Sequence, residues 1–260
     1  MSDQEQPTRS IDLSIEVPGT PEEVWAAIAS GPGIGSWFVP TEIDAQEGGR
    51  IVQHFGPGMD EEGVVTAWDP PHRYAFGAPD GSGLAFEWLV EARDGGSCVV
   101  RLVNSGFGTG EPWDDQYDAM NEGWLIFLAN LRLHLTHFRG RTGVSALPMA
   151  MWGESQHEAW QVLVDALDLA SPLVGATVTS GGGDAPTLSG TVVEVVAPHH
   201  LTLLLTEPAE GTGFFAAEQM GPAVGVSTWL YLYGDGAAAL AEQEGARWRE
   251  WLDRRAVPMG

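Results

Sequence analysis

The sequence predicts an α+β fold in which a curved antiparallel sheet wraps around a long C-terminal helix, and this arrangement is expected twice. Three observations lead to this fold class. A strand and a helix precede an unbroken series of short strands, which ends in the longest helical pattern of the chain. One of those strands alternates apolar and acidic side chains, as in a sheet with one dry and one wet face. A short segment of the first half recurs in the second half.

The first two elements have clear start and stop signals. Residues 11–17 alternate Ile, Leu, Ile and Val with Asp, Ser and Glu, which predicts a half-buried strand. Thr20 is a good N-cap, and Glu23 three residues later completes a capping box. The helix is therefore expected to begin after Thr20 and to stop at Gly31 and Pro32.

Short strands divided by Gly, Pro and Asp are expected next. They are placed near residues 37–43, 50–55, 63–69, 73–76, 84–92 and 97–104. In the strand at 84–92, Phe86, Trp88 and Val90 share one face, whereas Glu87 and Glu91 share the other. The sheet should therefore have an aromatic inner face and a solvated outer face.

The longest helical pattern covers residues 113–138. A single stripe at a period of 3.6 residues contains Tyr117, Met120, Trp124, Phe127, Leu128, Leu131, Leu135 and Phe138. This stripe is the surface on which the sheet is expected to pack.

Composition excludes several classes of function. The 260 residues include 36 acidic and 12 basic side chains, a net charge of −24, and every basic residue is Arg. Without Lys there can be no P-loop lysine and no Schiff-base chemistry. The deficit of cations also disfavours binding to nucleic acid or to an anionic membrane surface.

The chain is expected to be a soluble cytoplasmic protein. Cys98 is the only cysteine, so no internal disulfide can form, and it is expected to be a buried small residue. The first ten residues are polar, and the most apolar runs, 125–135 and 201–205, are too short to span a bilayer.

Three segments carry a family resemblance. They are I-D-L-S-I-E-V-P-G-T-P-E-E-V-W-A-A-I from residue 11, G-I-G-S-W-F from residue 33, and E-G-W-L-I-F-L-A-N-L-R-L-H-L over 122–135. They resemble the SRPBCC superfamily, whose START-like fold is called the helix-grip fold, and within it the branch homologous to the activator of the heat-shock chaperone ATPase. The resemblance covers residues 9–140. It implies a cavity between the sheet and the last helix; some members are cyclases or dehydratases, and others bind proteins.

The second half repeats part of the first. Residues 63–74 match residues 190–201 at a constant offset of 127, with Gly, Val, Pro and His in common, and the same offset places Trp124 on Trp251. We therefore predict an N-terminal helix-grip domain at 9–140, a linker at 141–149 and a shortened second copy at 150–257.

The candidate site is the aromatic lining of the first domain. Its expected members are Trp37, Phe38, His54, Tyr74, Phe76, Phe86, Trp88, Trp113, Trp124 and Phe127. These side chains could simply fill the interior, or they could line a pocket in which His54 or Tyr74 is the polar anchor. The assignment of His54 and Tyr74 depends on strand register, because a shift of one residue would turn both away.

Other candidate sites are interpreted as structural. His134 and His137 are three residues apart on a helix but lack the H-E-x-x-H motif of a zinc site. The acidic run at 60–62 lacks the ligand spacing of a calcium loop and is interpreted as a solvated turn. No catalytic residue, metal or cofactor is expected.

Three functions remain open. The preferred hypothesis is a non-catalytic protein that binds a small apolar or aromatic ligand in the first domain. The second is an enzyme of the cyclase or dehydratase type, which would need a buried acid–base pair. The third is a co-chaperone-like adaptor whose acidic surface binds a protein partner, and homodimer formation is also left open.

Overall fold

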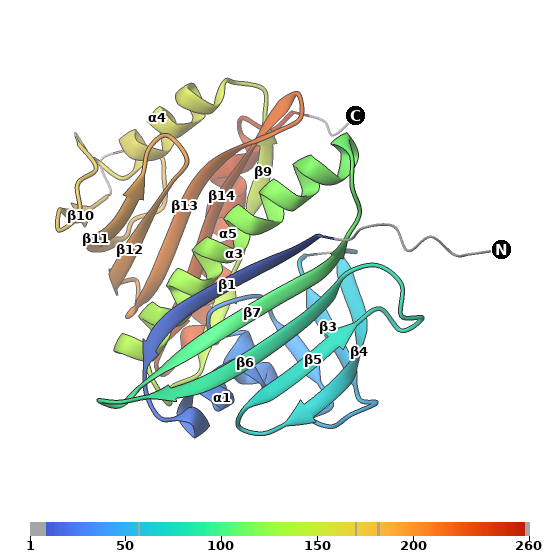
Figure 1. Cartoon of the computed structure of the whole chain (residues 1–260). Coiled ribbons are helices and arrows are strands. Elements are labelled where there is room, and N and C mark those ends of the chain that lie inside the picture. The colour runs from blue at the N-terminus through green and yellow to red at the C-terminus, as the bar shows by residue number, and fades with distance from the viewer. Residues whose placement is uncertain (1–8, 57, 170, 181–182, 258–260) are drawn as a thin grey trace. The chain divides into compact units, whose positions relative to one another are not determined.

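The computed structural model describes residues 9–56, 58–169, 171–180 and 183–257, and the chain divides into two compact units (Figure 1). The first unit is Met1–Thr142 and the second is Gly143–Gly260. Each unit has its own seven-stranded antiparallel sheet and its own helices. The predicted α+β helix-grip fold is confirmed.

In the first unit the strand order is β1-β7-β6-β5-β4-β3-β2, so the first strand pairs with the last. All the other neighbours are consecutive in the chain. The strands are β1 (Arg9–Pro18), β2 (Thr41–Ile43), β3 (Arg50–His54), β4 (Asp60–Asp69), β5 (Arg73–Gly77), β6 (Ala85–Arg93) and β7 (Ser97–Phe107).

Three helices accompany this sheet, namely α1 (Pro21–Ile28), α2 (Gly31–Ile34) and α3 (Glu111–His137). The predicted capping box of α1 is present: the Thr20 hydroxyl accepts from the Glu23 backbone N–H at 3.3 Å, and the Glu23 carboxylate accepts from the Thr20 N–H at 2.8 Å. The inner face of α3 buries the middle and last part of the predicted stripe, namely Trp124, Leu128, Leu131, Leu135 and Phe138.

One strand prediction and one turn prediction in this unit are wrong. The strand expected at 37–43 is reduced to β2, because the backbone N–H groups of Trp37 and Phe38 both donate to the Ile34 carbonyl, at 3.2 and 2.9 Å, and extend the α2 turn. The run at 60–62 is the beginning of β4 and not a solvated turn, because Glu61 and Glu62 pair with Gln53 and Val52 of β3. Both errors lie at the edge of the sheet where the pocket described below is formed.

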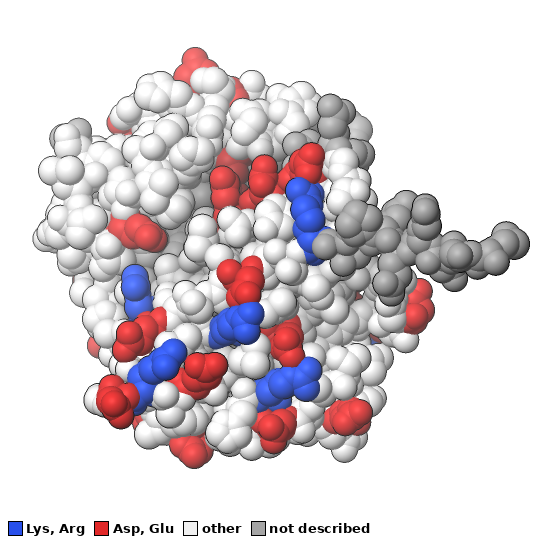
Figure 2. Space-filling view, in the orientation of Figure 1, with Lys and Arg blue, Asp and Glu red and all other residues white. Residues whose placement is uncertain are grey.

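The outer face of the first sheet is charged. Arg101 binds Asp12 across the β1–β7 pair, and Arg73 binds Glu87 across β5–β6. Figure 2 shows blue side chains lying beside red ones. Exposed pairs of this kind contribute little to stability and keep the wet face of the sheet in water.

The second unit has the strand order β10-β11-β12-β13-β14-β8, and β9 also pairs with β14. Its elements are β8 (Gly143–Ala146), β9 (Met149–Trp152), α4 (Gln156–Ala166), β10 (Thr177–Thr179), β11 (Ser189–Val196), β12 (His200–Glu207), β13 (Gly211–Met220), β14 (Ala223–Tyr233) and α5 (Ala237–Asp253). As in the first unit, the opening strands pair with the last strand, and a helix follows.

The segment 141–149, expected as a linker, is largely part of the second sheet. Residues 143–146 form β8, and residue 149 begins β9. Both strands hydrogen-bond to β14, the first to Leu230–Tyr233 and the second to Val224–Ser227. The first strand of the second unit is thus built from two short pieces.

The internal repeat extends to hydrogen bonding at the same offset of 127. The β4–β5 register shifts between Val65 and Ala67, and the β11–β12 register shifts between Val192 and Glu194. The carbonyl of His72 accepts from the N–H of Val90, and its counterpart His199 accepts from Ala217, each at 2.8 Å. A shared bulge and a shared turn support the predicted duplication.

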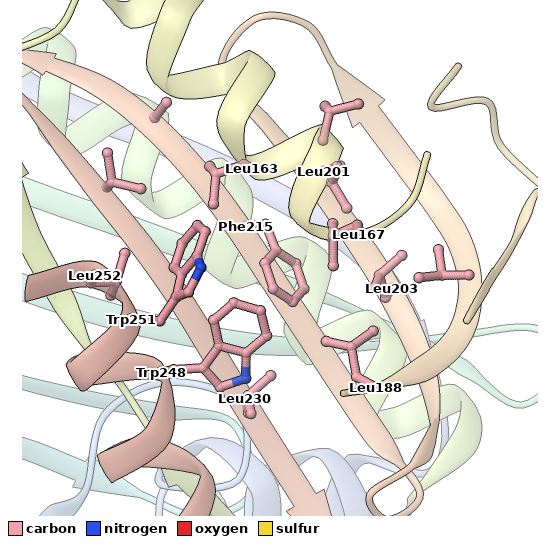
Figure 3. Packing of buried hydrophobic residues seen from close by; sticks show 14 of the residues in the cluster. Leu163, Leu167, Leu188, Leu201, Leu203, Phe215, Leu230, Trp248, Trp251 and Leu252 are labelled. Atoms are coloured by element: carbon pink, nitrogen blue, oxygen red, sulfur yellow. The ribbon is translucent and has the colours of Figure 1, made fainter. Parts of the chain in front are cut away.

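The core of the second unit is filled with large side chains (Figure 3). Trp248 and Trp251 of α5 and Leu163 of α4 point toward the sheet, where Phe215 of β13 lies 5.5 Å from Trp248 between ring centroids. Trp248, Trp251 and Phe215 are at most 2% exposed. This packing is the filled-interior alternative considered for the aromatic residues of the first half.

Candidate functional site

An aromatic cluster lies between the sheet and α3 of the first unit. Phe38 contacts Trp124 and Phe127, with ring centroids 5.0 and 4.5 Å apart, and Trp88 lies 5.6 Å from Trp124. Trp37 lies 5.7 Å from Trp88. Four of these five side chains are at most 5% exposed, and Phe127 is half-buried. They pack against one another and form a solid layer.

Tyr74 is part of this layer. Its ring stacks between Phe76 and Trp88, and its hydroxyl donates to the Ile28 carbonyl at 2.7 Å. Complete burial raises the pKa of the phenol well above its ordinary value. Tyr74 thus fixes the end of α1 to the sheet, and its hydroxyl is already engaged.

His54 lies outside the pocket lining. Its Nδ1 is 2.9 Å from Asp60, its Nε2 is 3.6 Å from Glu42, and the side chain is 34% exposed. Because side chains alternate along β3, Ile51 and Gln53 face the inside of the unit and His54 faces the other way. The polar residue of β3 that faces the inside is therefore Gln53 and not His54, as was expected from the sequence.

A pocket of about 390 Å³ opens between the sheet and α3 at the edge formed by β3, β4 and β5. One wall comes from Ile51 of β3, and Phe76 and Phe86 form another on β5 and β6. The loop of residues 78–84 and the first half of α3, through Gln116 and Met120, complete it. Its volume lies in the range of small-molecule sites.

Small residues create this space. Gly63, Gly77, Ala78 and Gly83 all line the pocket. A Cβ atom at Gly63 would lie 3.0 Å from the Ile51 side chain and 3.0 Å from the Gly77 carbonyl, so a side chain at this position of β4 would require these neighbours to shift. The aromatic layer that fills the rest of the interior therefore ends here and leaves a hollow.

Three polar residues line the pocket from β3 and β4, namely Gln53, Glu61 and Glu62. Gln53 and Glu61 are directly opposite each other in the antiparallel pair and so face the same side. Gln53 is 7% exposed, and Glu61 is exposed. The wall thus combines apolar and polar side chains, and Gln53 is a buried one of the polar set.

Of the ten predicted site residues, the structure places Phe76 and Phe86 at the pocket. The aromatic layer beside the pocket contains Trp37, Phe38, Tyr74, Trp88, Trp124 and Phe127. His54 lies outside the pocket lining. Trp113 packs on Gly108, where an added Cβ atom would lie 2.5 Å from the Trp113 Nε1. Sequence reasoning missed Gln53, Glu61 and Gln116. The alternation from Ile51 to Gln53 was a usable signal, but Val52 is also apolar and left the register ambiguous.

A second hollow of about 390 Å³ lies between α1, α2 and the end of α3. His134 lines it together with Ala26, Ala27 and Gly33. The imidazole is 3% exposed, and burial lowers its pKa to about 4. Among the described residues, no group of three or more His, Cys, Asp or Glu side chains could hold a metal ion.

Residues 18–136 match the sequence model of the family described as "Activator of Hsp90 ATPase homolog 1-like protein", AHSA1. The match runs from the end of β1 to the end of α3 and includes every strand around the pocket. The first unit is similar to this family over most of its length. The helix-grip resemblance read from the sequence is thereby confirmed, and we call this unit the AHSA1-like unit.

Among curated proteins, the uncharacterized protein Rv1546 of Mycobacterium tuberculosis (strain ATCC 25618 / H37Rv) is 28% identical over 113 residues, a match that covers 37% of this chain and 77% of that protein. The protein MT1597 of strain CDC 1551 / Oshkosh matches to the same extent. Both are similar to part of the chain only, and neither has a described activity.

Three solved structures are similar to all or part of the chain. DynU16, from the dynemicin biosynthetic locus, has a TM-score of 0.44 and 17% identity, with 94% of this chain and 96% of that chain covered. The di-domain ARO/CYC BexL from the BE-7585A biosynthetic pathway has a TM-score of 0.42 and 18% identity, with 95% and 93% covered. The Aha1 dimer from Colwellia psychrerythraea has a TM-score of 0.44 and 19% identity, with 51% and 99% covered.

No helix in the described part of the chain is both long and apolar enough to cross a membrane.

Proposed function

We propose that the AHSA1-like unit binds a small, mainly apolar or aromatic molecule in the pocket between its sheet and α3. The observation that carries this proposal is the composition of the pocket wall. Phe76, Phe86, Ile51 and Met120 supply apolar contact, and polar side chains stand beside them, namely Gln53, Glu61, Glu62, Ser82 and Gln116. A concave wall that combines aromatic and aliphatic side chains with placed polar groups is typical of small-molecule sites.

Binding is favoured over catalysis of the cyclase or dehydratase type. Such an enzyme would need an acid–base pair inside the pocket, and the two candidates from the sequence were His54 and Tyr74. The imidazole of His54 lies beside Asp60 on the other face of β3, and the hydroxyl of Tyr74 donates to the Ile28 carbonyl. Neither side chain offers a proton to a molecule in the pocket.

The test is a calorimetric titration of the full chain with 1-naphthalenemethanol, a neutral aromatic alcohol small enough for the pocket. We expect Gln116→Trp to weaken binding at least about tenfold, because a Trp ring on this turn of α3 would occupy the hollow. The control is Gln161→Trp, the same substitution at an exposed site on α4 of the second unit. Equal affinities of the parent chain and Gln116→Trp, or no binding by the parent chain, would overturn the proposed function.

A further inference from the structure

The pocket has an acceptor-rich end without a cation. Gln53 is 93% buried, and within the described chain its side chain makes no hydrogen bond to another residue. Glu61, opposite it on β4, forms no ion pair with any described residue. A buried amide that lacks a protein partner is costly unless a ligand or water completes its hydrogen bonds.

The neighbouring carboxylates on β4 are engaged differently. Glu62 also lines the pocket but pairs with Arg50 at 2.8 Å, which lowers the pKa of the Glu62 carboxyl. Asp60 lies 2.9 Å from the His54 ring. Glu61 is therefore the carboxylate of this run that lines the pocket without an ion pair to a described residue, and no Arg is part of the pocket lining.

The second unit provides an internal comparison. At the offset of 127, Gln53 corresponds to Ser180 and Glu61 to Leu188, and the Ile51–Gly63 pair corresponds to Val178–Gly190. The Ser180 hydroxyl accepts from the Leu188 N–H at 3.0 Å, and both residues are at most 2% exposed. The same place in the second unit is thus buried and internally hydrogen-bonded, with Leu188 where the first unit has a carboxylate, so the fold does not require a charged residue there.

We propose that the pocket selects ligands whose polar end is a protonated amine or another cationic hydrogen-bond donor, and that it rejects carboxylates. This inference rests on the proposed function. The Glu61 carboxylate pairs with the positive charge, and the Gln53 side-chain carbonyl accepts a hydrogen bond from the same group. An anionic end would meet Glu61 without any compensating cation in the lining.

Three ligands of nearly equal shape test this selectivity. They are 1-naphthylmethylamine, which is protonated at neutral pH, 1-naphthalenemethanol, which is neutral, and 1-naphthoate, which is anionic. Titrated into the full chain at low salt, the amine is expected to bind at least about tenfold more tightly than the carboxylate, and the alcohol should lie between them.

Two substitutions separate the roles of the polar pair. Glu61→Gln should reduce the amine-to-carboxylate affinity ratio to about threefold or less, because it removes the charge and keeps the shape. Gln53→Leu should weaken the amine and the alcohol alike by about fivefold, the effect of one hydrogen bond. The control is Glu91→Gln, the same charge change on the outer face of β6, which should leave the ratio unaltered.

The outcomes distinguish this inference from the proposed function. If 1-naphthoate binds as tightly as the amine and Gln116→Trp weakens both, the proposed function stands and the charge selectivity is overturned. An unaltered ratio in Glu61→Gln would also overturn the role of this carboxylate. If none of the three ligands binds, both proposals fail.

Discussion

Replacement of Trp37 by Ala is expected to lower the free energy of unfolding of the AHSA1-like unit by about 3–5 kcal/mol, as for other large buried side chains. The indole is 1% exposed, contacts Phe38 and Trp88, and donates from Nε1 to the Ala27 carbonyl at 2.9 Å. The backbone carbonyl of Trp37 accepts a hydrogen bond from the Asn130 side-chain amide at 2.8 Å. The substitution would leave a cavity at the point where α1, the sheet and α3 meet.

Hydrogen exchange at increasing urea concentration, read separately on peptides of α3 and α5, measures this effect in each unit. Trp37→Phe keeps most of the packing and loses the bond to Ala27, so it should cost less than Trp37→Ala. Trp248→Ala is the matched control, because that indole is also 1% exposed but belongs to the core of the second unit. A loss below about 1 kcal/mol in Trp37→Ala would contradict the central position of this residue.

The predictions that succeeded rest on local patterns whose physical cause lies within one element. The capping box at Thr20 and Glu23 satisfies hydrogen bonds within its own turn. The alternation in β1 and the stripe of α3 each define one buried face, whichever element packs against it. The failures at 37–43 and 60–62 have a different origin. There the outcome depends on which distant strand or turn supplies the backbone partner, as with the Ile34 carbonyl and β3.

The sequence indicated the residues of the aromatic layer, but not the polar residues and glycines that line the pocket. Aromatic side chains indicate a buried interior but not which of them line a pocket. Phe76 and Phe86 lie at the pocket, whereas Trp88 and Trp124 are buried within the aromatic layer. The pocket forms beside Phe76 and Phe86 because positions such as Gly63 and Gly77 carry no side chain. A glycine has no functional group, so its role here is not evident from the sequence. His54 was a candidate because its imidazole can titrate. The strand register instead places Gln53, the preceding residue, on the inner face of the sheet.

Acidification is expected to destabilise the AHSA1-like unit through His134. Burial lowers the pKa of this imidazole to about 4 in the folded chain, against an ordinary value near 6.5 in the unfolded chain. Between these two values the unfolded chain binds more protons, so the free energy of unfolding rises with pH across this window. The stabilising contribution is complete above pH 6.5, is lost as the pH falls toward 4, and amounts to about 3 kcal/mol in total.

The comparison that isolates this contribution is the pH dependence of unfolding in the parent chain and in His134→Gln, which cannot titrate. Carboxylates contribute equally to both, so the difference between the two curves from pH 7 to pH 4 reports His134 alone. The parent chain should lose about 3 kcal/mol more than the variant over this range. His137→Gln removes an exposed histidine one turn along α3 and should follow the parent curve. Parallel curves for the parent chain and His134→Gln would mean that the imidazole is hydrated in the folded chain, and the hollow beside α1 would then have to be open to water.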